Sequence, residues 1–561
     1  MSDLNQTSQR ILRSATDRRN VLRGFGAASA GAASVALGGG IASASLFRGA
    51  DIDARFQDGT PAAGGVLRLT GHQDIPGLSP EDAGATVPFV AIVQIHNAMV
   101  ELDELLTFQP VLATELPSVS ADGLTYTCLL RDDVTFQNGD PFSSADVKYT
   151  MDWTKDPANA SVNAGSFENV TSVEAPDATT IVVTLSAPNA AFNALIGSTL
   201  ILPSGYHAEV GQTAYAQAPI GTGPFMVNSF DPAARTLLDA YDGHFRGRPM
   251  IDQLQIDVVP EASVRAEALE NGESDNSIWA LTPEDDERLT GDPNFTTYST
   301  LNTAVNHFPL NNQHPILSDV RVRRAMMFAI DRQLVVDEIF LGAAQLATSN
   351  LSPAVATFYT DAVTQYPFDP DQAMALLEEA GWVQGDGEFR AKDGQELTFT
   401  ISIPSGDSTR RSEAEVVSDF LRDVGIDAQL RETPVAQILD QLPSGEADAG
   451  LFNWTYGDGG DPDATSVLSS TGPNNFSSFR NPRVDDLLKQ GIVALTQEER
   501  VPIYQEIQQI VADEVPFLFI CYLQGRTHYA ARVKGLPAAE QVLDSDNLYK
   551  KAYTFSLDPA Q

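Results

Sequence analysis

Short strand-like runs alternate with longer amphipathic segments along the body of this chain, and this alternation is the strongest constraint on its fold. The runs at 124–130 (LTYTCLL) and 181–185 (IVVTL) carry the β-branched and aromatic residues typical of strands. Apolar residues at helical spacing over 412–424 and 500–513 predict amphipathic helices. Because these segments follow one another without a repeat period, they predict α/β lobes.

Single residues predict where several helices begin and end. Between residues 319 and 342 we expect two helices, the first capped by Asp319 and the second by Asp331. The run at 369–372 (DPDQ) places an Asp N-cap before a proline at the first helical position, with Gln three residues on. Gly381 is the expected stop for that helix.

The net charge of the chain argues against two classes of function, and its length bounds the number of domains. The chain has 561 residues, with 35 Lys and Arg against 75 Asp and Glu, a formal net charge of -40. Nucleic-acid binding and polybasic membrane attachment both need a basic face, so no nucleic-acid partner is expected. The acidity is typical of a solvated, self-repelling surface. At roughly 150 residues per domain, the length predicts about three to four units.

The N-terminal segment has the pattern of an export signal. Five arginines precede residue 24, and residues 24–47 carry no charged side chain and consist mostly of Gly, Ala and Ser. The pair Arg18-Arg19 resembles the twin-arginine pattern. The small residues Ala42-Ser43-Ala44 mark the expected end of the signal, where cleavage would occur. We therefore predict an export signal at 1–44, cleaved or kept as an anchor, then a flexible linker at 45–64. The protein is expected to be exported, periplasmic or on the outer face of a bacterial or archaeal cytoplasmic membrane.

Motifs for catalysis and metal binding were sought and not found. The sequence has no GxSxG elbow, no Walker motif, no GxGxxG after a strand and no HxH or HExxH spacing. The glycine-rich run 221–224 (GTGP) predicts a tight turn, because no helix opens after it. Cys128 and Cys521 are predicted to be two buried free thiols or one long-range disulfide. We expect no enzyme, no cofactor and no resident metal.

Many short motifs, taken in chain order, are similar to those of one known family. The resemblance is to the family 5 extracellular solute-binding proteins, the dipeptide-, oligopeptide- and nickel-binding components of ABC importers, and it covers about residues 65–530. The motifs that carry it are PVLATEL (110–116), DGLTYT (122–127), LRDDVTFQNG (130–139), SADV (144–147), PIGTGPF (219–225), HFRGRP (244–249), ALENGESD (268–275), DVRVRRA (319–325), AIDR (329–332), EAGW (379–382), VGID (424–427) and VDDL (484–487).

The resemblance implies an α/β, two-lobed periplasmic-binding-protein fold of the Venus-flytrap type, in the large cluster with an extra subdomain inserted in lobe 1. The implied boundaries are 65–302 for lobe 1 with the insert at about 103–203, 303–515 for lobe 2, and 516–561 for a C-terminal return to lobe 1. Ligand is trapped in the cleft as the lobes close, and the closed form docks on ABC transporter permease subunits in the membrane. A monomer is expected.

The same resemblance points to a ligand-binding loop at 452–463 (FNWTYGDGGDPD). It looks like the loop of the dipeptide-binding members in which an aspartate receives the peptide amine, so Asp458 is the first candidate and Asp461 the second. Trp454 and Tyr456 are expected to stack on ligand side chains. His72, in the loop after the predicted strand 66–70, would face the cleft from the first lobe.

Alternatives stay open at each of these points. Asp461 and Asp463 also fit the cap of a helix that starts after Pro462, and His72 also fits a surface loop. The leading function is a peptide-binding receptor of an importer. Within the same fold and role, the ligand could instead be an oligosaccharide, an opine, heme or a nickel complex. A cell-surface interaction protein and an enzyme are the remaining classes.

Overall fold

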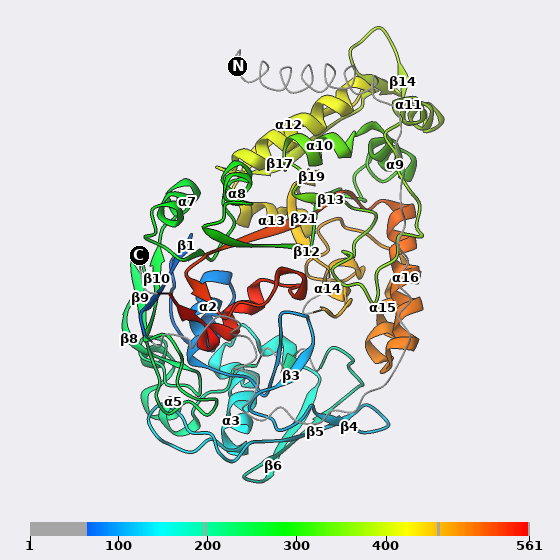
Figure 1. Cartoon of the computed structure of the whole chain (residues 1–561). Coiled ribbons are helices and arrows are strands. Elements are labelled where there is room, and N and C mark those ends of the chain that lie inside the picture. Colours follow the sequence, from blue (N-terminus) through cyan, green and yellow to red (C-terminus); the bar gives the residue numbers. More distant parts are fainter. Residues whose placement is uncertain (1–63, 193–194, 197–198, 457–459, 559–561) are drawn as a thin grey trace, which may run out of the picture.

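The computed structural model describes residues 64–192, 195–196, 199–456 and 460–558. The predicted export signal, nearly all of the predicted linker, and Asp458 lie outside these residues. Two lobes lie side by side in the described chain (Figure 1). Lobe 1 here means the part packed around the buried cluster that contains Leu67, Ile256 and Tyr529, and lobe 2 the part packed around the cluster that contains Phe308, Ile401 and Leu487.

One large sheet runs through both lobes. Its order is β20-β12-β21-β11-β1-β10-β9-β8, with β13 also paired to β21. The β1 strand lies parallel to β10 and β11, and the pairs β8–β9, β9–β10 and β12–β21 are antiparallel. The bounds are β1 Val66–Gly71, β8 Phe225–Asp231, β9 Arg235–Ala240, β10 Gln253–Val258, β11 Asn276–Ser277, β12 Phe295–Pro309, β13 Ala344–Leu346, β20 Phe452–Thr455 and β21 Phe517–Ala530.

The long strands β12 and β21 connect the two lobes. Tyr298, near the start of β12, packs in the lobe 1 core, whereas Val305 on the same strand packs in the lobe 2 core. Between Leu301 and Val305 the pairing with β21 loses its register. This irregularity therefore lies where the paired strands pass from one core to the other. The lobe boundaries at 302/303 and 515/516 stay predictions.

Lobe 1 contains a further core of its own, made of residues between Met99 and Ile201. A four-stranded antiparallel sheet in the order β4-β5-β7-β6 supports this core, and helix α3 packs against β6 and β7. The bounds are β4 Ser118–Val119, β5 Thr125–Leu129, β6 Val170–Asp177, β7 Thr180–Leu185 and α3 Ser144–Lys155. The predicted strands at 124–130 and 181–185 are confirmed, and the limits 103–203 of the insert stay a prediction.

Shorter elements complete lobe 1. The β2–β3 hairpin and helix α2 lie beside the C-terminal 3-10 helix η7 near the centre of the molecule (Figure 1). Helices α7 and α8 follow β10 and β11. The bounds are α2 Thr86–Ile95, β2 Val100–Leu102, β3 Phe108–Pro110, α5 Ser204–Val210, α6 Gln212–Tyr215, α7 Ala262–Glu270, α8 Pro283–Leu289, β22 Val533–Lys534, η7 Asp546–Thr554 and β23 Ser556–Leu557.

Lobe 2 has a small parallel sheet in the order β18-β17-β19, against which α12 and α13 pack. Helices α15 and α16 pack against each other along the right-hand side of the molecule in Figure 1. The bounds are α9 Val320–Ala329, α10 Arg332–Glu338, α11 Pro370–Glu379, β14 Val383–Gln384, β15 Arg390–Lys392, β16 Gln395–Glu396, β17 Thr398–Pro404, α12 Ser408–Asp423, β18 Asp427–Thr433, α13 Val435–Ser444, β19 Ala449–Gly450, α14 Thr465–Leu468, α15 Pro482–Val493 and α16 Gln497–Glu514.

The predicted helix caps are confirmed. Asp319, Asp331 and Asp369 each accept a hydrogen bond from a backbone N–H in the first turn of α9, α10 and α11. Helix α12 begins four residues before the predicted start because Asp407 caps it. Helix α16 begins three residues early because Thr496 and Glu499 form a capping box.

The run 221–224 bends the chain and no helix opens after it, and the structure shows why it needs glycine. A Cβ added to Gly221 would lie 1.9 Å from the carbonyl oxygen of Ile95, and one added to Gly223 would lie 2.3 Å from that of Gln94. The turn therefore packs directly on the backbone at the end of α2. Cys128 and Cys521 are both free and buried.

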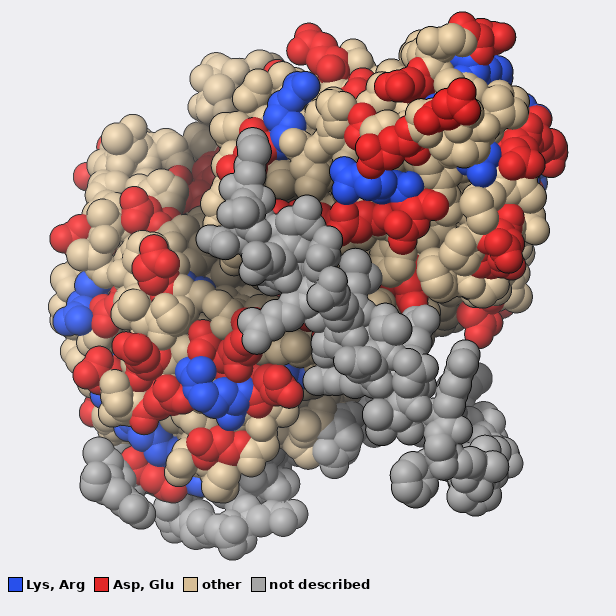
Figure 2. All heavy atoms as spheres, turned by 90° about the horizontal axis from the view of Figure 1, so that it is seen from above, with Lys and Arg blue, Asp and Glu red and all other residues tan. Residues whose placement is uncertain are grey.

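Acidic side chains are prominent on the face of the molecule shown in Figure 2, in keeping with the strongly negative composition. Among the described residues, no helix is long and apolar enough to cross a membrane.

Candidate ligand-binding cavity between the lobes

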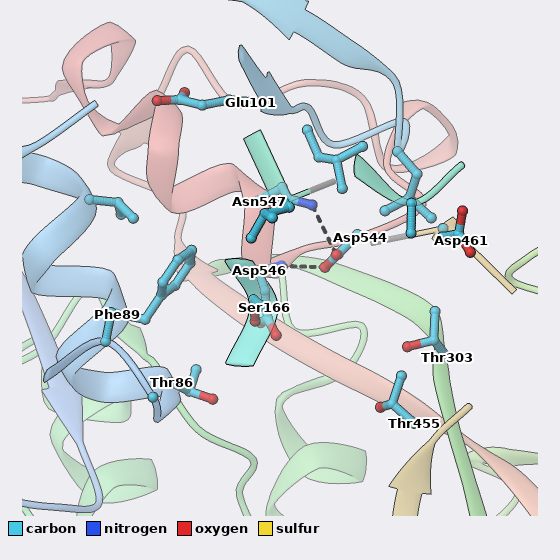
Figure 3. Close-up of a pocket in the computed structure, with 18 of the residues that line it drawn as sticks. Thr86, Phe89, Glu101, Ser166, Thr303, Thr455, Asp461, Asp544, Asp546 and Asn547 are labelled. Carbon is cyan, nitrogen blue, oxygen red and sulfur yellow. Dashed lines mark hydrogen bonds between the residues drawn. The ribbon is translucent and has the colours of Figure 1, made fainter. Parts of the chain in front are cut away.

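A cavity of about 1120 Å³ lies between the two lobes. Lobe 1 contributes the first half of α2, the β2–β3 hairpin and the start of η7, and lobe 2 contributes β20, residues 460–463 and α14. Thr303, at the irregularity in β12, also lines the cavity and is drawn in Figure 3. Ligand pockets commonly measure roughly 300–1,000 Å³, so this cavity is large enough for a ligand of several residues.

The strand β20 forms part of the cavity wall. Asn453, Trp454 and Thr455 all line the cavity. Because β20 ends the strand order of the sheet, one of its edges pairs with β12 and the other is unpaired among the described residues. Trp454 is partly buried and packs edge-on against Phe476 at a centroid distance of 4.8 Å. Of the residues predicted from sequence, the structure thus places Trp454 at the cavity.

Asp461 also lines the cavity, but its carboxylate is engaged within the protein. Arg500, on α16, donates to both of its oxygens at 2.7 and 2.8 Å. The two side chains are only 14 % and 8 % exposed, and Asp461 also accepts from the backbone N–H of Asp463 at 2.9 Å. This bidentate pair ties the cavity loop to α16.

Asp463 begins the turn that leads into α14. Its carboxylate accepts from the backbone N–H and the hydroxyl of Thr465 at 3.1 and 2.6 Å. Burial raises the pKa of Asp463, and the bonds from Thr465 oppose that shift. Asp463 thus bonds to the first residue of α14, but the N-cap of that helix is Ala464, so Asp463 holds the turn before the helix and also lies on the cavity wall.

Tyr456 lies away from the cavity wall. Its ring is buried in the lobe 2 core, stacked on Phe517 at 5.3 Å, and its hydroxyl is 3.2 Å from Nε2 of His307. Strand alternation would place residues 454 and 456 on the same face, but β20 ends at Thr455, so Tyr456 lies beyond the strand and does not follow its alternation. The sequence alone does not distinguish these two aromatic positions.

His72 is not brought to the cavity either. It lies just after β1 and stacks on Trp279, with ring centroids 4.7 Å apart. Burial, and then the nearby Arg265 charge, lower the pKa of His72. Trp279 is 46 % exposed, so this pair forms a small aromatic surface at the carboxyl end of the parallel strands β1 and β11.

Sequence reasoning missed the contribution of the C-terminal segment. Asp544, Asp546 and Asn547 line the cavity (Figure 3). Lys550, from the same segment, lines it too. Asp544 accepts from the backbone N–H of Asp546 and from Nδ2 of Asn547, both at 2.9 Å. No local signal could have singled out these carboxylates, because the chain contains 75 acidic residues.

A buried polar network supports the cavity wall from behind. Arg410, on α12, donates through Nη2 to Oδ1 of Asn453 at 2.7 Å, and it also bonds to Asn306 on β12. Asn306 in turn donates to Glu413, which is fully buried. Burial raises the pKa of Glu413 to about 7, against the opposing influence of Arg410. The network joins the cavity strand β20 to the lobe-connecting strand β12.

The described residues contain no group of three or more His, Cys, Asp or Glu side chains arranged to hold a metal ion.

Comparison with known proteins identifies the family. The family of bacterial extracellular solute-binding proteins, family 5, matches residues 107–476. Heme-binding protein A of Haemophilus influenzae is 28 % identical over 474 residues, covering 79 % of this chain and 84 % of that protein. The glutathione-binding protein GsiB of Escherichia coli K12 is 27 % identical over 458 residues, covering 79 % and 86 %.

A solved structure shows the same architecture. The periplasmic binding protein DppA of Helicobacter pylori, in complex with the peptide STSA, superposes with a TM-score of 0.74 at 25 % identity, covering 89 % of this chain and 99 % of that one. The predicted two-lobed periplasmic-binding-protein fold is therefore confirmed. The chain belongs to the family 5 extracellular solute-binding proteins.

Proposed function

We propose that this chain is the extracytoplasmic receptor of an ABC importer, and that it captures short peptides in the interlobe cavity. Hinge closure about β12 and β21 would enclose the peptide, and the closed form would deliver it to permease subunits in the membrane. The family supports the receptor role, and the peptide complex of the DppA relative supports the ligand class. A receptor role assigns no catalysis to the chain.

The observation that carries the peptide proposal is the free edge of β20 along the cavity. An edge strand presents unpaired backbone N–H and C=O groups, and an extended peptide satisfies them by adding a strand. Trp454 on the same strand offers an aromatic face to a ligand side chain. A sugar or a metal complex lacks the regularly spaced N–H and C=O groups with which an extended peptide pairs to a strand edge.

We assign the peptide α-amine to Asp458. This residue is two positions before Gly460, which lines the cavity, and the bidentate bond to Arg500 leaves Asp461 less available. A charge-assisted hydrogen bond of this kind contributes roughly 1.5–3 kcal/mol. His72 and Tyr456 are left out of the proposed site because neither lines the cavity.

Export and assembly complete the proposal. Residues 1–44 would direct export by the twin-arginine route, as the pair Arg18-Arg19 indicates. The lobe limits 65–302, 303–515 and 516–561 are proposed together with the linker at 45–64. The receptor is proposed to act as a monomer, since each chain contains a complete interlobe cavity.

A thermal-shift screen tests the ligand class. The protein is heated with separate pools of di- to octapeptides, oligosaccharides, nickel chelates and heme, the last because of the Heme-binding protein A relative. A ligand at about 100 times its Kd stabilises the folded state by roughly 2.7 kcal/mol. We expect a shift with peptides only; a shift with another pool and none with peptides would overturn the proposal.

Two variants locate the site. Trp454→Ala should weaken peptide binding, whereas Trp279→Ala, which removes an exposed tryptophan away from the cavity, should not. Asp458→Ala should weaken peptide binding by roughly 1.5–3 kcal/mol and so shrink the peptide shift. Unchanged peptide affinity in Asp458→Ala would keep the function and refute the assigned amine anchor.

A further inference from the structure

The two lobes also touch away from the strands β12 and β21 that connect them. The backbone N–H of Ala190, in lobe 1, donates to the carbonyl oxygen of Ile492, near the end of α15 in lobe 2, at 2.8 Å. A Cβ added to Gly123 of lobe 1 would lie 2.7 Å from Cδ1 of Leu495 and 3.1 Å from Cβ of Pro188, so Leu495 of lobe 2 reaches the backbone of Gly123 beside Pro188. The hydrogen bond and the apolar contact together are called the closure contact here.

On the lobe 1 side, the closure contact is built on two segments that the four-stranded sheet holds together. Gly123 precedes β5, the segment 188–190 follows β7, and β5 is paired with β7. The hydroxyl of Tyr126, a buried residue of β5, donates to the carbonyl oxygen of Asn189 at 2.9 Å. This bond fixes the segment 188–190 to the core of the sheet.

On the lobe 2 side, the closure contact lies at the corner between two packed helices. Only residues 494–496 separate α15 from α16, so Leu495 lies at a tight corner. Arg500, on α16, donates to the carbonyl oxygen of Gly491 at 3.0 Å and to the carboxylate of Asp461 in the cavity loop. The corner and the cavity loop are therefore tied together within lobe 2.

The closure contact borders the cavity. Asn189 and Ala191, on either side of Ala190, both line it, and so does Thr303 at the irregularity in β12. At β12 and β21 the chain itself passes from one lobe to the other, so the lobes stay joined there when they move apart. The closure contact has no covalent link, and opening of the lobes would break it.

The closure contact is small enough to form and break repeatedly. Leu495 remains 40 % exposed with the lobes in contact, and a single interlobe hydrogen bond accompanies it. A hydrogen bond and a partly buried leucine together change the ratio of closed to open chains by roughly tenfold to a hundredfold. Such a contact favours the closed arrangement without making it permanent.

We propose that the closure contact is a latch that sets the balance between open and closed chains, and through it the affinity for ligand and the ease of its release. A ligand that binds the closed form gains apparent affinity in proportion to the closed fraction of the free chain. The effect on ligand rests on the proposed function, whereas the balance in the free chain does not. Leu495 acts on affinity although it does not line the cavity.

Pulsed EPR distance measurements on the full chain test the latch. Spin labels are attached through Glu174→Cys on β6 and Lys489→Cys on α15, both exposed positions, while the native thiols Cys128 and Cys521 are buried. Without ligand, Leu495→Ser should raise the ratio of long to short distances by roughly fivefold to tenfold, as the loss of a partly buried leucine contact predicts.

The chain offers a matched control at the opposite end of lobe 2. Val383, on β14, is 56 % exposed and lies at the end of lobe 2 away from the four-stranded sheet (Figure 1). Val383→Ser makes a similar apolar-to-polar change and should leave the distances unchanged. Thermal unfolding of both variants verifies that each is folded.

Peptide affinity gives the second measurement. With the peptide pool that produces the largest thermal shift, Leu495→Ser should weaken apparent binding by up to the same fivefold to tenfold, and Val383→Ser should not weaken it. Unchanged affinity in Leu495→Ser would overturn the role of the latch in ligand binding, even where the distances change.

The outcomes separate the latch from the proposed function. Distances that are unchanged in Leu495→Ser, or that change equally in Val383→Ser, would overturn the latch and leave the peptide receptor standing. Distances that lengthen in Leu495→Ser alone, with no effect of any peptide pool, would support the latch and overturn the peptide ligand. A native chain with no short-distance population, with or without peptides, would overturn the latch.

Discussion

The buried ion pair between Asp461 and Arg500 provides the sharpest test of how the cavity loop is held. Asp461→Ala would leave the Arg500 guanidinium in a largely buried position with its remaining bonds to the Gly491 carbonyl and the Tyr504 hydroxyl. Removing one partner of a buried pair costs about 3–5 kcal/mol, because the other charge is left uncompensated. The change should therefore destabilise lobe 2.

The chain offers a matched control with the same chemistry at the surface. Arg483 and Glu506 also form a bidentate pair, at 2.7 Å for both bonds, between α15 and α16. Their side chains are 51 % and 43 % exposed, against 8 % for Arg500 and 14 % for Asp461. Exposed pairs contribute about 0–1 kcal/mol, so Glu506→Ala should be nearly neutral.

Scanning calorimetry compares the two variants. For a unit of lobe 2 size, 1 kcal/mol shifts Tm by about 2–4 °C, so Asp461→Ala should lower the transition by roughly 6–20 °C and Glu506→Ala by at most about 4 °C. Similar shifts for the two variants would refute the reasoning. A near-neutral Asp461→Ala that abolishes peptide binding would instead assign Asp461 to the ligand, as the sequence first suggested.

Three further predictions concern packing and buried polarity. Gly221→Ala should cost about 3 kcal/mol in urea unfolding, because its Cβ would meet the carbonyl of Ile95; an unchanged midpoint would contradict this. Tyr456→Phe should cost about 0.5–1.5 kcal/mol through the lost contact with His307 and leave ligand affinity unchanged, so weakened ligand binding would return Tyr456 to the site. The pKa of Glu413, raised to about 7 in the fold from its usual 4.5, means that stability falls as pH rises from about 4.5 to about 7. Glu413→Gln should remove about 3 kcal/mol of that pH dependence of the unfolding free energy, and equal slopes for both proteins would argue against it.

Local sequence patterns predicted the elements well where the responsible interaction is itself local. The Asp caps of α9, α10 and α11 bond to backbone groups two or three residues away, so their effect is visible in a few letters of sequence. Where predicted starts were late, in α12 and α16, the true caps Asp407 and Thr496 lie just upstream of the apolar periodicity. Collinear motifs were sufficient to predict the family, since many weak matches in one order are jointly specific.

The candidate site was predicted only in part, because its walls come from distant segments. The loop at 452–463 was identified, and Trp454 and Asp461 do line the cavity. Which of two nearby aromatics faces the cavity depends on the end of β20, and Tyr456 was drawn into the core by His307 and Phe517. The engagement of Asp461 by Arg500 joins residues 39 positions apart, which no local pattern reports.

Composition and local patterns predicted an acidic α/β protein, and the collinear motifs predicted a two-lobed receptor through their resemblance to the family. Only the tertiary structure brought the C-terminal acids to the wall formed by α2, the β2–β3 hairpin and β20. In the linear chain Asp544 and Asp546 are two among 75 acids, and nothing distinguishes them. Tertiary packing does, because η7 packs on α2 and Lys550 reaches the carbonyl oxygen of Leu102, 448 positions earlier in the chain, and this contact brings both acids to the cavity.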